Sequence, residues 1–582
     1  MTVARRRRLV DLARRRTIIL ASMAAVGVPA MALAPLAARA DGQSPTFTAE
    51  YVSTSIGGGE PFVIYSKATG NLIYSGHEGT THIDKNFVTT PGSSCDIQTA
   101  SGFICSYDNH VNDWYSTDNG KTWTRSLDSP INTGFSDPSL TEDAAGNVYN
   151  TGIDLANDAL FLSADGGKSF VTGTPQCSQG DRPWLAGGTA GEVFLGTDLE
   201  LGTHTVFKGF VEPGATPGGN QQLTIVCSKS GISHGAAATS SGIGSPMAYD
   251  SRDDSLIEPI RGAGKIGIGV LPKASSAFGS DPSQTPTGAF VDRMDSGLKT
   301  SFFDAIQDSL AISQGSDNTI YVVWATGDRD PAGKNGCGSY SPVSGGTLGK
   351  ATLLPNKVMM AWTGDEGLTW SAPVEVAGPD TTGGTTMVWP WVTAGAAGNV
   401  SVAWFQADQS TDPDCDSAAL LPNGRATNWT LQVANVFGAT DPATAYPPAS
   451  VNAIPNFDGS HKNGVFHVGG ICQSGTTCAA TGQDRRLGDY FTNALDKDGC
   501  VMVATTDTQL VDPVTGTGYS TGRPLFVHQS GGNSLTTGLP CGAPTVGVPE
   551  APLGIALPLG GLVLAGAFVA AGRIRRRGPV PA

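Results

Sequence analysis

The feature that most constrains this chain is a repeat that recurs six times along its middle. Each copy has a polar turn, a short apolar patch, a glycine-containing turn and then a run rich in β-branched and aromatic residues. The copies cover residues 60–74, 137–149, 181–194, 308–324, 389–402 and 488–503. Residues 247–270 leave room for a seventh, degenerate copy. Repeat units of this size cannot bury an apolar face alone, so we expect them to stack into one all-β array.

A second unit follows three of these repeats and has the pattern Ser/Thr-x-Asp-x-Gly-x-Ser/Thr-Trp/Phe. It occupies residues 116–123, 163–170 and 363–370. The Asp side chain of such a turn can bond backbone N–H groups of its own turn, the Gly accepts a positive φ, and the closing aromatic packs between strands. We therefore expect self-stabilised hairpin turns. The residues with this structural role are Asp118, Gly120, Trp123, Asp165, Gly167, Phe170, Asp365, Gly367 and Trp370.

These turns resemble the Asp-box, or bacterial neuraminidase repeat, of the sialidase superfamily, and the resemblance covers roughly residues 50–530. It implies an all-β fold, a six-bladed β-propeller with four antiparallel strands per blade, in which the Asp-boxes lie away from the active face. The six repeats agree with six blades, while the degenerate copy leaves a seven-bladed propeller open. The region has more residues than six blades of ordinary length need, so we expect long surface loops at 211–246, 271–300 and 327–350.

The resemblance also implies a chemistry. Three arginines would hold a substrate carboxylate, a Tyr activated by a Glu would be the nucleophile, and an Asp would be the general acid/base. The Arg-Ile-Pro motif that carries the first arginine in the family is absent, and the opening repeat reads Gly59-Glu60-Pro61-Phe62.

Candidate site residues follow from the geometry of a propeller, in which the segments that enter the innermost strands converge on the axis. The catalytic candidates are Glu60, Asp181, Asp489 and Tyr490, and Asp137 belongs to the same ring. The substrate-binding candidates are Arg182, Arg485, Arg486 and His110. The same residues could instead satisfy buried turns between blades.

Two functions stay open. One is an exo-acting glycoside hydrolase of the sialidase type on terminal sugars, and the other is a non-catalytic extracellular propeller that binds glycans, envelope polymer or protein. Neither requires a cofactor. Ca²⁺ is the cation that the acidic turns would suit, and no metal ligands are identified.

The two ends of the chain read as targeting signals. Residues 1–40 are typical of a signal peptide, with a basic start, an apolar run and a small-x-small cleavage pattern. The propeller is expected over 41–535 and a linker with a Pro-Glu motif over 536–552. Residues 553–572 form an apolar run long enough to cross a bilayer, and an Arg-rich cytoplasmic tail follows at 573–582. We expect an exported protein at the cell surface, with a C-terminal membrane segment that is either retained or processed.

The part of the chain between these signals is strongly acidic. Residues 41–572 hold 24 Lys and Arg against 50 Asp and Glu, a net charge of -26. This balance excludes a nucleic-acid partner and opposes long-range attraction of anionic substrates. The expected partner is a glycan or glycoconjugate, and the oligomeric state stays open. The ten cysteines predict disulfides, with local bridges at Cys95–Cys105 and Cys472–Cys478.

Overall fold

The computed structural model divides the chain into two units, Met1–Gly42 and Gln43–Ala582. It describes residues 44–542, with gaps at 78–96, 100–101, 105–110, 128–135, 155–156, 179, 199–203, 216–220, 235–246, 263–264, 300–309, 327–356, 380–384, 410–425, 472–483, 515, 517 and 520. The expected signal peptide, membrane segment and cytoplasmic tail lie outside the described residues. Within the described residues, no helix combines the length and the apolar character that a membrane crossing needs.

Seven antiparallel sheets make up the described part of the second unit, and we number them as blades 1 to 7 in chain order. Blade 1 contains β2 (Gly59–Tyr65), β3 (Leu72–His77), β6 (Val111–Ser116) and β7 (Thr124–Arg125). Blade 2 contains β8 (Ser136–Glu142), β9 (Val148–Asp154), β10 (Asn157–Ser163) and β11 (Val171–Ser178). Blade 3 contains β12 (Asp181–Gly187), β13 (Glu192–Asp198), β14 (His204–Ala215) and β15 (Gln221–Cys227), with β16 (Ile232–Ser233) paired to β14.

The remaining blades have the same order of strands. Blade 4 contains β17 (Ala248–Asp250), β18 (Ser255–Gly262), β19 (Lys265–Leu271) and β20 (Val291–Lys299). Blade 5 contains β21 (Leu310–Gln314), β22 (Ile320–Thr326), β23 (Lys357–Thr363) and β24 (Val374–Ala377). Blade 6 contains β25 (Met387–Ala394), β26 (Val400–Ala407), β27 (Asn428–Val436) and β28 (Val451–Asn452), with β29 (Val465–Val468) paired to β27. Blade 7 contains β30 (Thr492–Leu495), β31 (Val501–Asp507), β32 (Arg523–Gly531) and β1 (Thr46–Tyr51).

Three short elements lie outside this pattern. They are a hairpin of β4 (Ile97–Thr99) and β5 (Gly102–Ile104), the helix α2 (Ala274–Ala277) and the 3-10 helix η4 (Lys462–Gly464).

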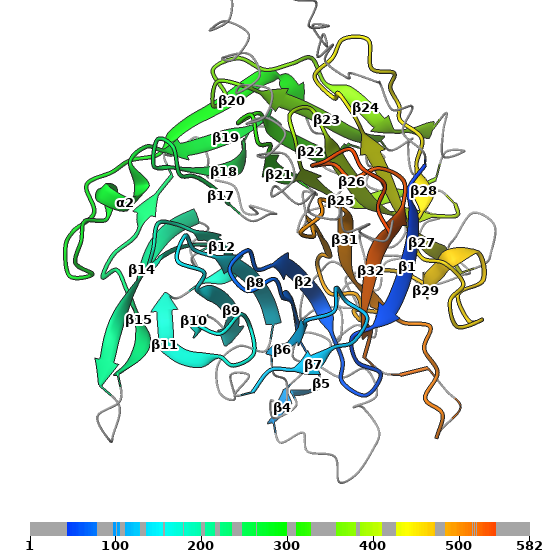
Figure 1. Cartoon of the computed structure of the whole chain (residues 1–582), viewed down its shortest axis with the longest axis horizontal. Coiled ribbons are helices and arrows are strands. Elements are labelled where there is room, and N and C mark those ends of the chain that lie inside the picture. The colour runs from blue at the N-terminus through cyan, green and yellow to red at the C-terminus, as the bar shows by residue number, and fades with distance from the viewer. Residues whose placement is uncertain are drawn as a thin grey trace, which may run out of the picture. The chain divides into compact units, whose positions relative to one another are not determined.

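The first strands of successive blades contact one another in a closed circuit, so the sheets form a propeller (Figure 1). The circuit runs through β2, β8, β12, β17, β21, β25 and β30, and β30 returns to β2. β1 closes the ring because it pairs with β32, which joins the start of the described chain to its end (Figure 1). Burial follows this arrangement: every residue of β31 is buried between neighbouring strands, whereas the outermost strand β1 alternates exposed and buried residues.

The fold confirms the expected all-β propeller with four-stranded antiparallel blades, but the count of six blades is wrong and the alternative of seven is correct. The additional sheet is blade 4, which contains the degenerate stretch 247–270. Its first strand β17 has three residues and carries no Pro, so the repeat pattern is weak there. Two expected surface loops are shorter than predicted: part of 211–246 belongs to β14 and β15, and 291–299 belongs to β20, whereas 272–290 contains no strand.

The three Asp-containing turns have the local hydrogen bonds that their pattern predicts. In the first, Asp118 accepts from the backbone N–H of Thr122 at 2.9 Å and from its hydroxyl at 2.7 Å. The Gly120 N–H donates to Ser116 Oγ at 2.9 Å, and Gly120 has a φ of 85°. The turns at Asp165 and Asp365 repeat each of these bonds. All three turns follow the third strand of a blade, and therefore lie at the end of the blade opposite to the start of its first strand.

Two disulfides connect described residues. Cys177 on β11 bonds Cys227 on β15 and so links the outer strands of blades 2 and 3. Cys500 bonds Cys541 and fixes the segment after β32 to the start of β31. Four cysteines in the expected local pairs, Cys95, Cys105, Cys472 and Cys478, lie outside the described residues.

The disulfide between blades 2 and 3 closes a loop with a sequence separation of 50 residues. Removing it in a Cys177→Ser/Cys227→Ser variant should lower the free energy of unfolding by about 2–4 kcal/mol, because the unfolded chain loses a crosslink. Denaturant unfolding followed by Trp fluorescence measures this change. An unchanged midpoint relative to the oxidised wild type would show that the bond does not stabilise the propeller.

Candidate active site at the propeller axis

The entry into the first strand of four blades has an unusual backbone. Glu60, Asp137, Arg182 and Trp389 each precede a Pro and each have a φ between 47° and 56°. Left-handed backbone is uncommon for residues other than Gly, and the residue before Pro normally favours extended conformations. The pairing register shifts at the same point in β2, β8, β12 and β25. Such bulges redirect side chains, and strain of this kind is often found at functional sites.

The bulges at Glu60, Asp137 and Arg182 belong to the neighbouring blades 1, 2 and 3, and they bring charged side chains together at one end of the axis. Glu60 is completely buried, and its carboxylate accepts the backbone N–H of Asp137 at 3.1 Å. His77 Nε2 lies 3.5 Å from the same carboxylate. Glu60, Asp137, Asp181, Arg182, Arg485 and Asp489 form what we call the axial cluster. It contains five of the residues that the sequence places on the axis, together with Arg485, a substrate-binding candidate.

Arg485 is the central cation of the axial cluster. Its guanidinium forms an ion pair with Asp489 and lies 3.5 Å from Glu60 Oε1, and it also donates to the Gly488 carbonyl at 3.0 Å. Arg182 lies within the electrostatic reach of Asp489, Asp181 and Asp137. Asp181 is exposed and Arg182 is half-buried, so these two residues form the open side of the axial cluster.

The pKa values of the carboxylates in the axial cluster are shifted in opposite directions. Asp181 lies at the exposed edge of the axial cluster, where desolvation by the surrounding groups and the negative charge of Asp137 raise its pKa to about 7. Burial also raises the pKa of Glu60, and the charge of Asp489 adds to that effect. Burial opposes ionisation of Asp489 as well, but the guanidinium of Arg485 outweighs it and lowers the pKa of Asp489. One acid that keeps its proton near neutral pH therefore lies in the same field as one ionised carboxylate, an arrangement suited to acid/base chemistry.

Tyr490 takes part in an aromatic layer next to the axial cluster. Its ring centroid lies 5.0 Å from that of Trp184, which in turn lies 6.0 Å from that of Trp391. Its hydroxyl donates to the Pro138 carbonyl at 2.7 Å, and burial raises the pKa of this hydroxyl. The hydroxyl proton is thus bound to a backbone carbonyl, and the nearby charge of Glu60 adds to the effect of burial on this pKa.

Two substrate-binding candidates do not join the axial cluster. Arg486 forms a two-pronged ion pair with Asp484 and donates to the carbonyls of Thr508 and Tyr519. Adjacent arginines in the sequence therefore have separate partners. His110 lies outside the described residues.

The sequence reasoning missed a second group of ionisable residues, between blades 3 and 4. His204, His234 and Glu258 present one nitrogen or oxygen each within 4.8 Å of one another, and this geometry could hold a metal ion. Each histidine also contacts an Asp, at Asp198 and Asp292. The five residues are spread over 95 positions of the sequence with no short motif, so only the sheet pairing brings them together.

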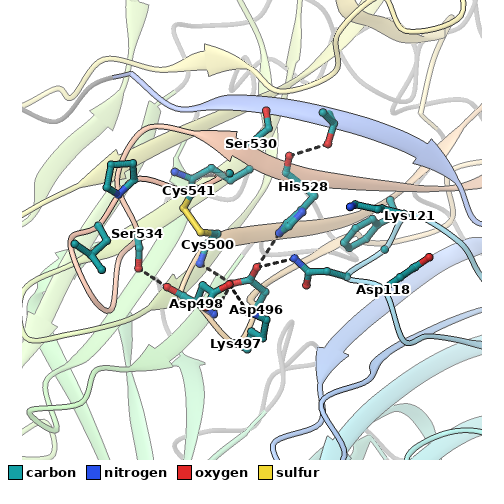
Figure 2. A pocket seen from close by; sticks show the side chains of 18 of the residues that line it. Asp118, Lys121, Asp496, Lys497, Asp498, Cys500, His528, Ser530, Ser534 and Cys541 are labelled. Carbon is teal, nitrogen blue, oxygen red and sulfur yellow. Dashed lines mark hydrogen bonds and ion pairs between the residues drawn. A yellow bond between two sulfur atoms is a disulfide. The ribbon is translucent and has the colours of Figure 1, made fainter. Parts of the chain in front are cut away.

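A cavity of about 1130 Å³ lies at the opposite end of the blades, between the Asp118 turn and blade 7 (Figure 2). Figure 2 shows Asp496 at its centre, where its carboxylate accepts from His528 Nε2 at 2.9 Å and Asn119 Nδ2 at 3.3 Å. The Cys500–Cys541 disulfide lies beside it. In this cavity the Asp496 carboxylate and the His528 ring are already bound to each other, and the residues that line the cavity include no arginine.

Comparison with known proteins identifies structural similarity alone. No protein-family model matches the chain, and no curated protein sequence matches it. The phage phi92 endosialidase aligns over 84% of this chain and 69% of its own length, with 11% identity and a TM-score of 0.37. The NanB sialidase from Streptococcus pneumoniae aligns over the same shares, with 12% identity and a TM-score of 0.33. The Aleuria aurantia lectin aligns over 67% of this chain and 99% of its own, with 12% identity and a TM-score of 0.33. Scores this low assign no role to any residue of this chain.

Gly488 allows a direct test of how tightly the axial cluster is packed. A Cβ at this position would lie 2.2 Å from Glu60 Cγ, and Gly488 has a φ of 69°. Gly70 also has a positive φ, of 78°, but a Cβ there would meet nothing within 4 Å. Both Gly→Ala variants carry backbone strain, so the additional cost at Gly488 reports the packing against Glu60. We expect Gly488→Ala to be less stable than Gly70→Ala by about 1–3 kcal/mol.

The measurement is the free energy of unfolding of the two variants by denaturant titration. Equal losses of stability would contradict the close packing of Gly488 against Glu60.

Proposed function

We propose that this chain is an exported, surface-anchored propeller that binds the terminal sugar of a glycan at the axial cluster and hydrolyses its glycosidic bond. The observation that carries the proposal is the set of charged residues held in strained bulges at three neighbouring strand entries, Glu60, Asp137 and Arg182. A Gly would adopt this backbone without strain. Because charged residues stand here despite the strain, we infer that their side chains have a function that offsets the energetic cost of the strain. The sequence features at 1–40 and 553–572 support the export and anchoring part.

The proposed chemistry uses two carboxylates. Asp181 is the general acid, because a pKa of about 7 leaves about half of its carboxyl groups protonated at neutral pH and more below it, and the acid form gives its proton to the leaving oxygen. Asp489 is the ionised partner, which takes a proton from the attacking water or stabilises positive charge at the anomeric carbon. Water is added across the bond, the proton that Asp489 accepts passes to solvent, and Asp181 recovers a proton from solvent. Arg182 donates to sugar oxygens at the mouth of the axial cluster.

The preferred substrate is a neutral sugar rather than a sialoside. Two arginines belong to the axial cluster in the described part of the chain, and Arg485 is already bound to Asp489 and close to Glu60. The net charge of -26 over residues 41–572 adds a field that opposes an anionic substrate. Tyr490 has no part in this scheme.

The second candidate function is sugar binding without hydrolysis. It is favoured by the same full pairing of Arg485, because buried charges that neutralise one another need no further role. Binding of a monosaccharide without turnover of any glycoside would support this function and would contradict hydrolysis.

The experiment is an assay of the purified full-length chain on fluorogenic glycosides of fucose, galactose, glucose, N-acetylhexosamines and sialic acid. We expect turnover of a neutral glycoside, with sialosides the poorer substrates. Asp181→Asn should lower turnover at least about 100-fold, as expected for loss of a general acid. Asp118→Asn is the matched control, because Asp118 lies in a structural turn at the opposite end of blade 1, and it should keep wild-type turnover.

The dependence of turnover on pH is a separate prediction. Because the acid form of Asp181 is the active one, turnover should fall as the pH rises through about 7. A rate profile from pH 4 to 9 measures this limb. A rate that stays constant above pH 7, or a profile that keeps its alkaline limb in Asp181→Asn, would remove Asp181 from the role of acid.

A further inference from the structure

A chain of five ionisable residues crosses the joint between blades 3 and 4. Glu258 on β18 lies at its centre and is completely buried. His204 Nε2 is 3.1 Å from Glu258 Oε1, and His234 Nε2 is 2.5 Å from Glu258 Oε2. The outer nitrogens are held as well: His204 Nδ1 is 2.9 Å from Asp198, and His234 Nδ1 is 2.7 Å from Asp292. Both histidines therefore direct Nε2 toward the same carboxylate.

This arrangement has the two layers that metal sites have. The inner layer is two imidazole nitrogens and one carboxylate, and the outer layer is one carboxylate on the far nitrogen of each histidine. Outer carboxylates of this kind fix the tautomer and the ring orientation of ligating histidines. The His234 ring is further fixed by stacking on Phe290, with ring centroids 3.8 Å apart.

Glycine keeps the space beside the inner layer free. A Cβ on Gly196 would lie 2.7 Å from Glu258 Oε1, 2.9 Å from His204 Nε2 and 3.1 Å from Met247 Sδ. An atom at that point would thus be close to two of the three inner ligand atoms. Any side chain at position 196 would occupy the space that an ion and its fourth ligand need.

We propose that His204 Nε2, His234 Nε2 and a Glu258 oxygen bind one divalent transition-metal ion of the zinc type. Two imidazoles with one carboxylate suit zinc and its neighbours, whereas Ca²⁺ and Mg²⁺ take oxygen ligands. Ligands on one zinc ion, about 2.0–2.1 Å from the metal and tetrahedral, lie about 3.3 Å apart. The distance between His204 and Glu258, 3.1 Å, is close to this value, and the 2.5 Å between His234 and Glu258 lengthens when the ion binds. Zinc takes the place of the protons that the two Nε2 atoms share with Glu258.

The role of this ion is to fix blade 3 against blade 4. His204 belongs to β14 and His234 follows β16, which pairs with β14, whereas Glu258 belongs to β18 of blade 4. The three ligand residues are buried or nearly so, with at most 5% of each side chain exposed, so a substrate has little access to them. The site is structural, and it stands independently of the axial cluster and of the proposed hydrolysis.

The test is a zinc titration of the full chain after removal of metal with a chelator. We expect one Zn²⁺ per chain by isothermal titration calorimetry, a higher unfolding temperature with zinc than without it, and no response to Ca²⁺. Glu258→Gln and His234→Ala should weaken zinc binding more than about 100-fold. Loss of a residue that only hydrogen-bonds a ligand weakens metal binding up to about 100-fold, and loss of a ligand itself should weaken it more. Absence of a one-to-one zinc site in the wild type overturns the proposal, whatever the variants do.

His461→Ala is the matched control. His461 is a buried histidine that also lies between two carboxylates, Asp458 at 2.8 Å and Asp507 at 2.9 Å, but it is not part of a histidine pair. This variant should keep one zinc ion per chain, and loss of zinc here as well would contradict the assignment.

If Glu258→Gln or His234→Ala fails to fold, Asp292→Asn gives a milder change, because it leaves all three ligands in place. It should weaken zinc binding about 10–100-fold. Wild-type affinity in Asp292→Asn, or X-ray absorption of the zinc-loaded wild type without imidazole ligands, would overturn the site.

Discussion

Arg485 allows the propeller to bury carboxylates near its axis. Burying an unpaired carboxylate is costly, and a buried ion pair is tolerated only when its geometry is good and the remaining donors are satisfied. Arg485 meets this condition, since its guanidinium contacts Asp489, Glu60 and the Gly488 carbonyl. Glu60 in turn binds the backbone of Asp137 at the entry to the next blade. Blades 7, 1 and 2 are therefore joined at the axis by one network of charge.

The two ends of the blades have different tasks. At the end away from the axial cluster, Asp118, Asp165 and Asp365 each close a turn of their own blade, and hydrogen bonds from Thr369 lower the pKa of Asp365 to about 2. At the axial end, charges from different blades meet, the backbone is strained, and pKa values move apart. The turns are self-contained, whereas the axial charges are shared between blades, and perturbed carboxylates of this kind are concentrated at functional sites.

Much of the fold could be predicted from local patterns. The three turns were predicted because all their bonds lie within eight residues, and the convergence of Glu60, Asp181 and Asp489 followed from the repeat. Blade 4 was predicted only as a degenerate repeat, because its three-residue first strand β17 lacks the polar residue and Pro that begin several of the other copies. The partners of Arg485 and Arg486 could not be predicted, because adjacent side chains on this turn point to different neighbours. The cluster of His204, His234 and Glu258 depends on the register between blades, and nothing local in the sequence indicates it.

The position of a bound sugar tests most directly whether the axial cluster is the site of function. Crystals of the full chain would be soaked separately with galactose, fucose and N-acetylneuraminic acid. We expect a neutral sugar in contact with Asp181 and Arg182, the most exposed members of the axial cluster. A sugar bound only in the cavity beside Asp496, at the opposite end of the blades, would contradict it.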